Sequence, residues 1–264
     1  MSGRLPAWSA SSRASVTGCR RCCQTEAMSQ VIDLLSRPVY SLPQVDRVLG
    51  LHGGTARRWI DGYDRGGKHY DPVVREQTTG EEIVTWGEFV ETRLLSEYRD
   101  AGVPMLHMRP AVIALRDELQ TQYPLASAKT WLDVQGRELV SRVQEKVGLE
   151  QRLSLVVIRA GHQVMWSDEA DAFSRSIEWT DETVNGQVER LLAQTDLPDV
   201  VLDPLRGFGE PVLRGRNVAT EILGELYRAG ETVQGIAETY DLTPALVDEA
   251  VRYEFRHATS AVAS

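Results

Sequence analysis

Residues 203–254 decide the fold, and they read DPLRGFGEPVLRGRNVATEILGELYRAGETVQGIAETYDLTPALVDEAVRYE. Two short β-branched runs, at 200–202 and 211–213, flank a stretch rich in glycine and proline, which predicts a β-hairpin. Apolar residues then recur at helical spacing in three segments. Gly230 marks the end of the first helix, and Thr243 caps the third, with a proline following it. This order predicts a hairpin followed by three helices in a helix-turn-helix arrangement.

Three motifs within this stretch carry a family resemblance: GEPVLRG at 209–215, AGET at 229–232 and LTP at 242–244. Their order and spacing resemble the antitoxin-associated family of domains of unknown function numbered 433. Members of that family often stand beside a PIN-domain ribonuclease and serve as its antitoxin. The resemblance therefore implies a VapB-type antitoxin in a toxin–antitoxin pair whose partner is such a ribonuclease.

The third predicted helix of this module is acidic on its polar side. A helix that reads a major groove needs Arg, Lys, Asn or Gln toward the bases, and an acidic front is repelled by DNA. We therefore expect this module to serve dimerisation or toxin contact, through this helix or through the 203–215 hairpin. The alternative is a merely solvated face. The predicted contact residues are Arg214, Arg216, Asp248, Glu249, Arg252 and Phe255.

A second helix-turn-helix pattern lies at 40–63, YSLPQVDRVLGLHGGTARRWIDGY. Gly50 and Leu51 separate two predicted helices, and the second helix carries Arg57 and Arg58 in its first turns. A recognition helix presents side chains to base edges and phosphates from that position. We predict that this module binds double-stranded operator DNA.

A wing is predicted after this module, from Val73-Val74 and Ile83-Val84 joined by a turn at 78–80. Its alternative is a structural hairpin with incidental charges. Residues 40–125 resemble MerR-type winged helix proteins, through Leu49-Gly50-Leu51, Arg57-Arg58-Trp59 and Gly102-Val103 among others. The long dimerisation helix of many such regulators is missing, so the C-terminal module is the other candidate for dimerisation. The predicted DNA-binding residues are Thr55, Arg57, Arg58, Arg65, Lys68, His69 and Arg75.

The middle of the chain predicts a mixture of helix and strand. We expect a helix at 131–147, a strand at 153–158 with a partner at 163–166, a charged loop at 168–171 and a further strand at 173–179. These strands predict a small sheet that links the two helical modules and can continue onto the 200–213 hairpin. The fold class is therefore mainly α, of the α+β type.

Length and composition set the domain organisation. The 264 residues predict a disordered leader or a start-site extension at 1–27, a winged helix module at 28–125, a linking segment at 126–199, the C-terminal module at 200–257 and a tail at 258–264. All three cysteines lie in the leader and have no histidine or fourth cysteine nearby, so we expect no metal site. The net charge of −9 agrees with DNA binding only if cations cluster locally.

The sequence shows no phosphate-binding glycine loop, HExxH pair or GxSxG elbow, so we expect neither an enzyme nor a cofactor. No apolar run has the length of a membrane span. Together, the motifs and the family resemblance favour a cytoplasmic, homodimeric antitoxin that represses its own operon. A regulator whose middle domain holds a small molecule is the alternative, and an interaction scaffold without a DNA role is the third reading.

Overall fold

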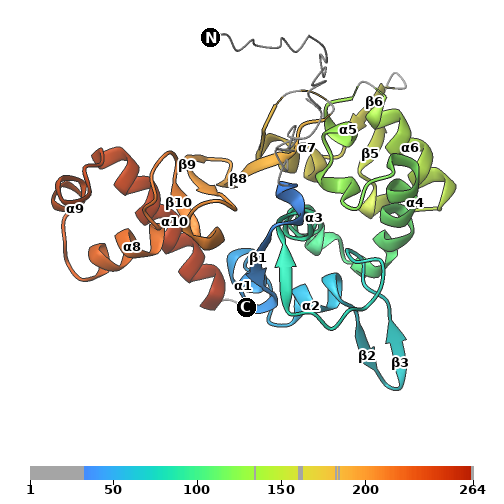
Figure 1. Cartoon of the computed structure of the whole chain (residues 1–264), viewed down its shortest axis with the longest axis horizontal. Helices are drawn as coiled ribbons and strands as arrows, with labels where there is room; N and C mark the ends of the chain where they lie inside the picture. Colours follow the sequence, from blue (N-terminus) through green and yellow to red (C-terminus); the bar gives the residue numbers. More distant parts are fainter. Residues whose placement is uncertain (1–32, 134, 160–162, 182, 184, 263–264) are drawn as a thin grey trace, which may run out of the picture. The chain divides into compact units, whose positions relative to one another are not determined.

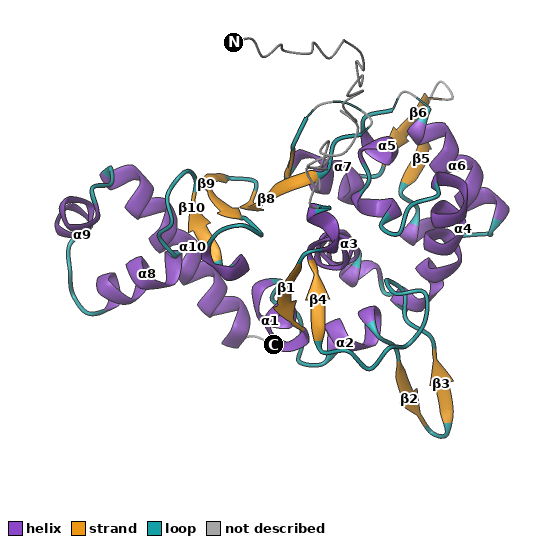
Figure 2. Cartoon of the chain, in the orientation of Figure 1, coloured by secondary structure: helices purple, strands orange, loops and turns teal. Residues whose placement is uncertain are grey.

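The computed structural model of the chain describes residues 33–133, 135–159, 163–181, 183 and 185–262. The predicted leader at 1–27, with its cysteines, lies outside the described residues. The described chain combines α-helices with small antiparallel sheets, which confirms the predicted α+β class (Figure 2).

The N-terminal part begins with a strand and a helix-turn-helix. Ser41 and Gln44 form a capping box that starts α1, and Thr85 and Glu88 form the one that starts α3. β1 pairs antiparallel with β4 (Figure 2). In this register Tyr40 lies opposite Val84. The elements are β1 (Pro38–Ser41), α1 (Leu42–Val48), α2 (Thr55–Ile60), β2 (Tyr63–Arg65), β3 (Lys68–Tyr70), β4 (Ile83–Thr85) and α3 (Trp86–Glu97).

The hairpin of this part is not where the sequence predicted it. β2 and β3 form it, joined by Gly66 and Gly67, whose φ angles of 61° and 76° suit a two-residue turn that follows strand twist. Val73 and Val74, predicted as a wing strand, are buried without strand structure, because both backbone N–H groups donate to the Trp59 carbonyl at 2.7 and 3.0 Å. The other predicted wing strand, β4, pairs with β1 instead.

The middle part contains α4 (Arg109–Leu119), α5 (Ala128–Trp131), α6 (Gly136–Lys146), β5 (Val156–Arg159), β6 (Gln163–Trp166), α7 (Asp168–Arg175), β7 (Ile177–Trp179) and β8 (Val188–Gln194). Short 3-10 turns lie at Leu34–Ser36, Arg99–Ala101, Met105–Met108, Pro124–Ala126 and Gln151–Leu153. The predicted pairing of a strand near 153–158 with 163–166 is confirmed by β5 and β6.

Three predictions for the middle part were wrong over all or part of their length. The segment 168–171 is the first turn of α7, because the Ser167 hydroxyl caps it by accepting from Ala170 N–H at 3.2 Å, and three carboxylates favour the positive end of a helix. The strand predicted at 173–179 is confirmed only at β7, Ile177–Trp179, because the chain is helix up to Arg175. The single helix predicted at 131–147 is divided between α5 and α6.

A four-stranded antiparallel sheet of order β10-β9-β8-β7 connects the middle to the C-terminal module (Figure 1). β9 (Leu197–Leu202) and β10 (Pro211–Leu213) form the predicted hairpin, with Pro211 opposite Leu202. The expected continuation of a linking sheet onto that hairpin is thus confirmed for β7 and β8, whereas β5 and β6, also expected in it, form a separate two-stranded sheet.

Three helices follow, as predicted: α8 (Thr220–Arg228), α9 (Val233–Tyr240) and α10 (Pro244–Val262). The Thr232 hydroxyl caps α9 by accepting from Gly235 N–H at 3.0 Å. Helix α10 continues to Val262, into the stretch expected to be a tail.

The described residues contain two hydrophobic cores. The larger one extends from Leu34 to Leu202 in sequence and is shared by the segments predicted as 28–125 and 126–199. Within it, the Phe89 ring stacks on two others. Its centroid lies 4.3 Å from that of Tyr40 and 5.4 Å from that of Trp86. The smaller core holds α8, α9 and α10 against β9 and β10. In the described part of the chain, no helix has the length and apolarity needed to cross a bilayer.

One carboxyl group is buried inside the larger core. Glu91 of α3 is 0% exposed, and its Oε1 accepts from Leu125 N–H at 2.9 Å, whereas Oε2 has no hydrogen-bond partner in the described structure. Burial raises the pKa of Glu91 to about 8, against the opposing effects of that N–H and of Arg116. The group is therefore neutral in the folded protein at pH 7.

This raised pKa gives a testable pH dependence. Because the folded pKa exceeds the unfolded one, the stabilising contribution of Glu91 is complete below about pH 4.5 and is lost as pH rises through about 8. We expect the free energy of unfolding of Glu91→Gln to match that of the wild type near pH 4.5 and to exceed it by about 4 kcal/mol at pH 8. Urea unfolding across this range measures the difference, with exposed Glu118→Gln as control. A constant difference between Glu91→Gln and wild type would contradict the assignment.

Candidate nucleic-acid interface

The helix-turn-helix is held by one carboxylate that the sequence analysis missed. Asp46 of α1 is buried and accepts from the backbone N–H groups of Gly54 at 2.6 Å and Ala56 at 2.7 Å. These are orphan donors at the start of α2, so a side chain of the first helix caps the second one. Gly54 itself has φ 80°, which lets the chain turn into α2. The angle between the helices is thus fixed by hydrogen bonds as well as by packing.

Helix α2 presents its two arginines outward. Arg57 and Arg58 are exposed, whereas Thr55 is 9% exposed and its hydroxyl accepts from Arg58 Nη2 at 2.8 Å. Thr55 thus orients Arg58 rather than facing solvent. Arg57 forms an ion pair with Glu82, and the two side chains are 44% and 59% exposed. Exposed pairs of this kind contribute little, so a phosphate can replace Glu82 at low cost.

The β2–β3 hairpin provides further cations next to α2. It projects away from the helices beside it (Figure 2), and Arg65, Lys68 and His69 are all exposed on it. His69 lies among acidic groups, since its ring nitrogens are 2.9 Å from Asp64 Oδ1 and 3.7 Å from Asp71 Oδ1. Arg65 and Lys68 at the tip are therefore better placed for phosphate than His69 is.

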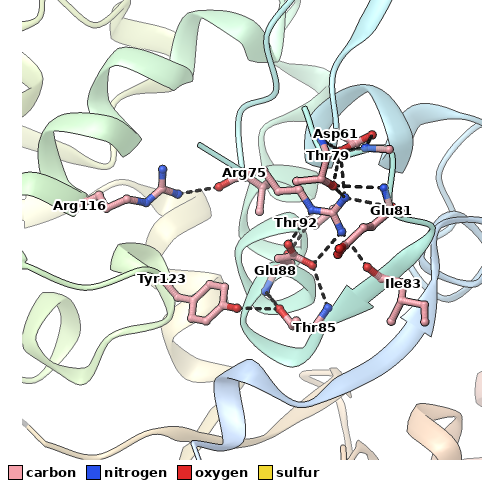
Figure 3. A network of polar contacts seen from close by, with 12 residues as sticks. Asp61, Arg75, Thr79, Glu81, Ile83, Thr85, Glu88, Thr92, Arg116 and Tyr123 are labelled. Carbon is pink, nitrogen blue, oxygen red and sulfur yellow. Dashed lines mark hydrogen bonds and ion pairs between the residues drawn. The ribbon is translucent and has the colours of Figure 1, made fainter. Parts of the chain in front are cut away.

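Arg75 was predicted to contact DNA, and the structure corrects this. Its side chain is 7% exposed and forms the centre of a buried network (Figure 3). The guanidinium donates to Glu88 Oε1 at 2.7 Å, to Asp61 Oδ1 at 2.9 Å and to the Ile83 carbonyl at 2.7 Å, with further donation to Thr79 and Glu81. This one side chain joins the C-terminal end of α2, the 79–83 loop and α3. It cannot reach a phosphate.

The network keeps its groups charged despite burial. Burial opposes ionisation of Asp61, but hydrogen bonds from Thr79 N–H and from Arg75 outweigh it and lower the pKa of Asp61. Burial likewise opposes the charge on Arg75, and hydrogen bonding to Glu88 and Asp61 raises the pKa of Arg75. Arg109 and Arg116 of α4 donate to backbone carbonyls of residues 72–76, the segment that contains Arg75, and Arg116 reaches the Val74 carbonyl at 2.6 Å. The loop behind α2 is thereby fixed.

The predicted contact residues of the C-terminal module divide into two groups. Arg214 is paired with Glu178 of β7, which joins the module to the middle part, and Glu249 accepts from Asp199 N–H at 3.1 Å within the module. The others are exposed: Arg216, Asp248, Arg252 and Phe255. Asp248 and Arg252 pair along α10 at 3.0 Å, and the Phe255 ring meets Tyr227 edge-on at 5.9 Å.

A contact between the helix-turn-helix and the C-terminal module was not foreseen. The Tyr40 hydroxyl, at the start of the helix-turn-helix, donates to the Gly209 carbonyl at 2.5 Å, and Arg47 of α1 forms an ion pair with Glu210. Burial raises the pKa of Tyr40 well above its usual value, so the phenol remains a neutral donor. Tyr40 and the GEPVLRG motif were each noted in the sequence, but nothing in the pattern indicated that they meet.

Comparison with known proteins shows the family to which the chain belongs. Residues 200–253 match the model of "Protein of unknown function (DUF433)". A Mycobacterium tuberculosis protein named "Uncharacterized protein Rv2308" is 36% identical over 224 residues, which cover 84% of this chain and 92% of that protein. Another protein of M. tuberculosis, named "Putative antitoxin VapB45", is 30% identical over 234 residues, covering 81% and 92%. The chain belongs to the family that contains these two proteins.

A solved structure supports the fold over most of the chain. The X-ray crystal structure of Rv2018 from M. tuberculosis is similar to this chain with a TM-score of 0.63 and 27% sequence identity. The match covers 81% of this chain and 97% of that one. The fold of most of the chain is therefore shared beyond this sequence.

Proposed function

We propose that this protein is the antitoxin of a type II toxin–antitoxin system, that it acts in the cytoplasm as a homodimer, and that it is not an enzyme. It neutralises a PIN-domain ribonuclease and represses its own operon by binding operator DNA. The relative named as an antitoxin and the match to the DUF433 family support the toxin–antitoxin role. The likeness of the N-terminal part to MerR-type winged helix proteins supports the DNA role.

One observation carries the DNA role. Arg57 and Arg58 are exposed on a short helix that is rigidly capped by Asp46, next to a projecting hairpin with Arg65 and Lys68 at its tip. A fixed helix and a basic hairpin are the two parts by which winged helix proteins contact a groove and its phosphates. On a chain with net charge −9, this local group of cations is where DNA would bind.

Co-expression tests the antitoxin role. The chain is produced together with the product of the adjacent gene, the proposed PIN-domain ribonuclease, and growth and co-purification are measured. We expect the chain to restore growth and to elute with the ribonuclease as one complex. Persistent growth arrest with full-length, folded chain would exclude neutralisation.

The DNA role predicts a loss of operator affinity when the two arginines of α2 are removed. We expect Arg57→Ala combined with Arg58→Ala to weaken operator binding by about 30-fold or more, and to reduce the slope of log affinity against log salt by about 2. Fluorescence anisotropy on the operator measures both quantities. Arg137→Ala with Arg142→Ala removes the same charge from exposed positions of α6 and serves as the matched control.

A change of opposite sign sharpens this test. Glu82→Gln removes the ion-pair partner of Arg57 and one negative charge, so we expect operator affinity to rise by roughly two- to tenfold. Equal operator affinity in the wild type, the double arginine variant and Glu82→Gln would remove α2 from the interface.

The ligand-responsive alternative has one observation in its favour. A cavity of about 690 Å³ lies beside the loop held by Arg75, between that loop and the end of α4. This volume is in the range of small-molecule sites. Its lining is largely polar and includes Glu76, Glu81 and Asp117, whereas such sites are usually apolar, so the antitoxin role remains the better supported.

A further inference from the structure

Phe208 has an unusual position at the turn between β9 and β10. Its side chain is 91% exposed, more than any other large apolar side chain of the described residues. The next most exposed is Ile158, at 61%, and Leu205 in the same turn is 58% exposed. A phenylalanine in water forgoes the stabilisation that burial of its ring would give. Two exposed large apolar side chains in one turn make this turn a candidate interaction site.

The backbone at Phe208 is also in a conformation that such a residue avoids. Its φ and ψ are 54° and 32°, in the left-handed region, where a Cβ crowds the following carbonyl. The glycines on both sides, Gly207 and Gly209, have φ values of 56° and 82°. Three successive left-handed residues thus place the only side chain of the three outward. Strain that the surrounding structure maintains indicates function.

The turn is fastened on both sides of Phe208. Gly207 N–H donates to Asn217 Oδ1 at 3.2 Å, and Glu210 N–H donates to the Gly207 carbonyl at 3.0 Å. The Tyr40 hydroxyl holds the Gly209 carbonyl from the other side at 2.5 Å. The ring therefore extends from a rigid support, which lowers the entropy lost when a partner binds it.

We propose that Phe208 is the anchor by which this protein docks its ribonuclease toxin, with Leu205 beside it, in an apolar pocket of the toxin. This inference rests on the proposed function and assigns the toxin contact to the hairpin turn instead of the acidic face of α10. Aromatic anchors that fill a partner's pocket dominate many interfaces. DNA is the less suitable occupant, because Asp203 and Glu210 flank the turn and Arg206 is engaged with Asp203 at 3.5 Å.

The left-handed backbone permits variants that remove the ring without harming the fold. Phe208→Gly relieves the conformational strain, and Phe208→Asn places a residue that tolerates this region. Both are expected to unfold at or above the wild-type temperature. Phe208→Trp retains an aromatic anchor. Ile158→Thr removes an exposed apolar side chain from β5 and is the matched control.

Calorimetric titration of each purified full-length variant with the co-encoded ribonuclease measures the affinity. We expect Phe208→Gly and Phe208→Asn to bind at least about 30-fold more weakly than wild type, and Phe208→Trp and Ile158→Thr to remain within about threefold. Wild-type affinity in both ring-deleted variants would overturn the anchor while leaving the antitoxin role intact. Failure of the wild type itself to bind would overturn the proposed function and the anchor together.

A second copy of this chain is the competing occupant. The molar mass of each variant in solution decides between the two. If Phe208→Gly converts a dimer into a monomer while its affinity for the toxin is unchanged, the turn is a self-association surface and the proposal is wrong. If the mass is unchanged and toxin affinity falls, the turn docks the toxin.

Discussion

Arg75→Met is expected to lower the free energy of unfolding by about 3–5 kcal/mol. The substitution leaves the carboxylates of Asp61 and Glu88, whose side chains are 4% and 8% exposed, without their cationic partner. Removal of one member of a buried ion pair is costly because the remaining charge keeps its desolvation penalty. The carbonyls of Glu81 and Ile83 lose their donor as well. Lysine cannot replace the arginine, since its ammonium lacks the planar fork that reaches these acceptors together.

Thermal and urea unfolding measure this effect, which corresponds to a fall of roughly 10 °C in Tm for a chain of this size. Arg65→Met removes an arginine from the exposed hairpin tip and is expected to leave stability unchanged within about 0.5 kcal/mol. A similar small effect for Arg75→Met would show that the network is not formed in solution. The wild type and Arg65→Met should differ in operator affinity but not in Tm. This result would separate the DNA-contacting role of Arg65 from the structural role of Arg75.

Gly209→Ala is expected to destabilise the protein by about 2–5 kcal/mol, from two additive causes. The φ of 82° disfavours any Cβ, and that Cβ would lie 2.5 Å from Val39 Cγ1 and 2.6 Å from Tyr40 Cζ. Gly215→Ala separates the causes, because Gly215 has φ 69° but no atom within 4 Å of an added Cβ. It is expected to cost only about 1–2 kcal/mol. Urea midpoints that agree for the two variants would show that the close contact at Tyr40 contributes nothing.

The sequence predicted best where local rules act alone. In the C-terminal module, Thr232 and Gly230 mark helix ends, so the hairpin and the three helices were located without tertiary information. The wing was misplaced because Val73 and Val74 look like a strand, yet their N–H groups bond to Trp59. Two adjacent β-branched residues indicate a buried segment. Whether that segment pairs with another strand depends on its tertiary contacts. The Gly66-Gly67 turn was the local signal for the true hairpin.

The candidate site was predictable only in part. Arg57 and Arg58 lie outward on α2, as the helix-turn-helix pattern predicted. Arg75 is equally basic and adjacent, but its carboxylate partners come from α3 and from the end of α2, so sequence spacing could not show that it is buried. Phe208 was unremarked in the sequence because an aromatic residue between glycines does not reveal its exposure or its φ angle. The charge of a side chain can be read from the sequence, whereas its exposure to solvent depends on the fold.

The bond from Tyr40 to the Gly209 carbonyl, with the Arg47–Glu210 pair beside it, has a consequence for how this gene can change over time. A recombination event that exchanged the back half of the coding sequence for a foreign one would bring an unmatched surface against Val39 and Tyr40. Such chimaeras would emerge poorly folded and be removed by proteases. We therefore expect the two halves of the chain to be inherited together.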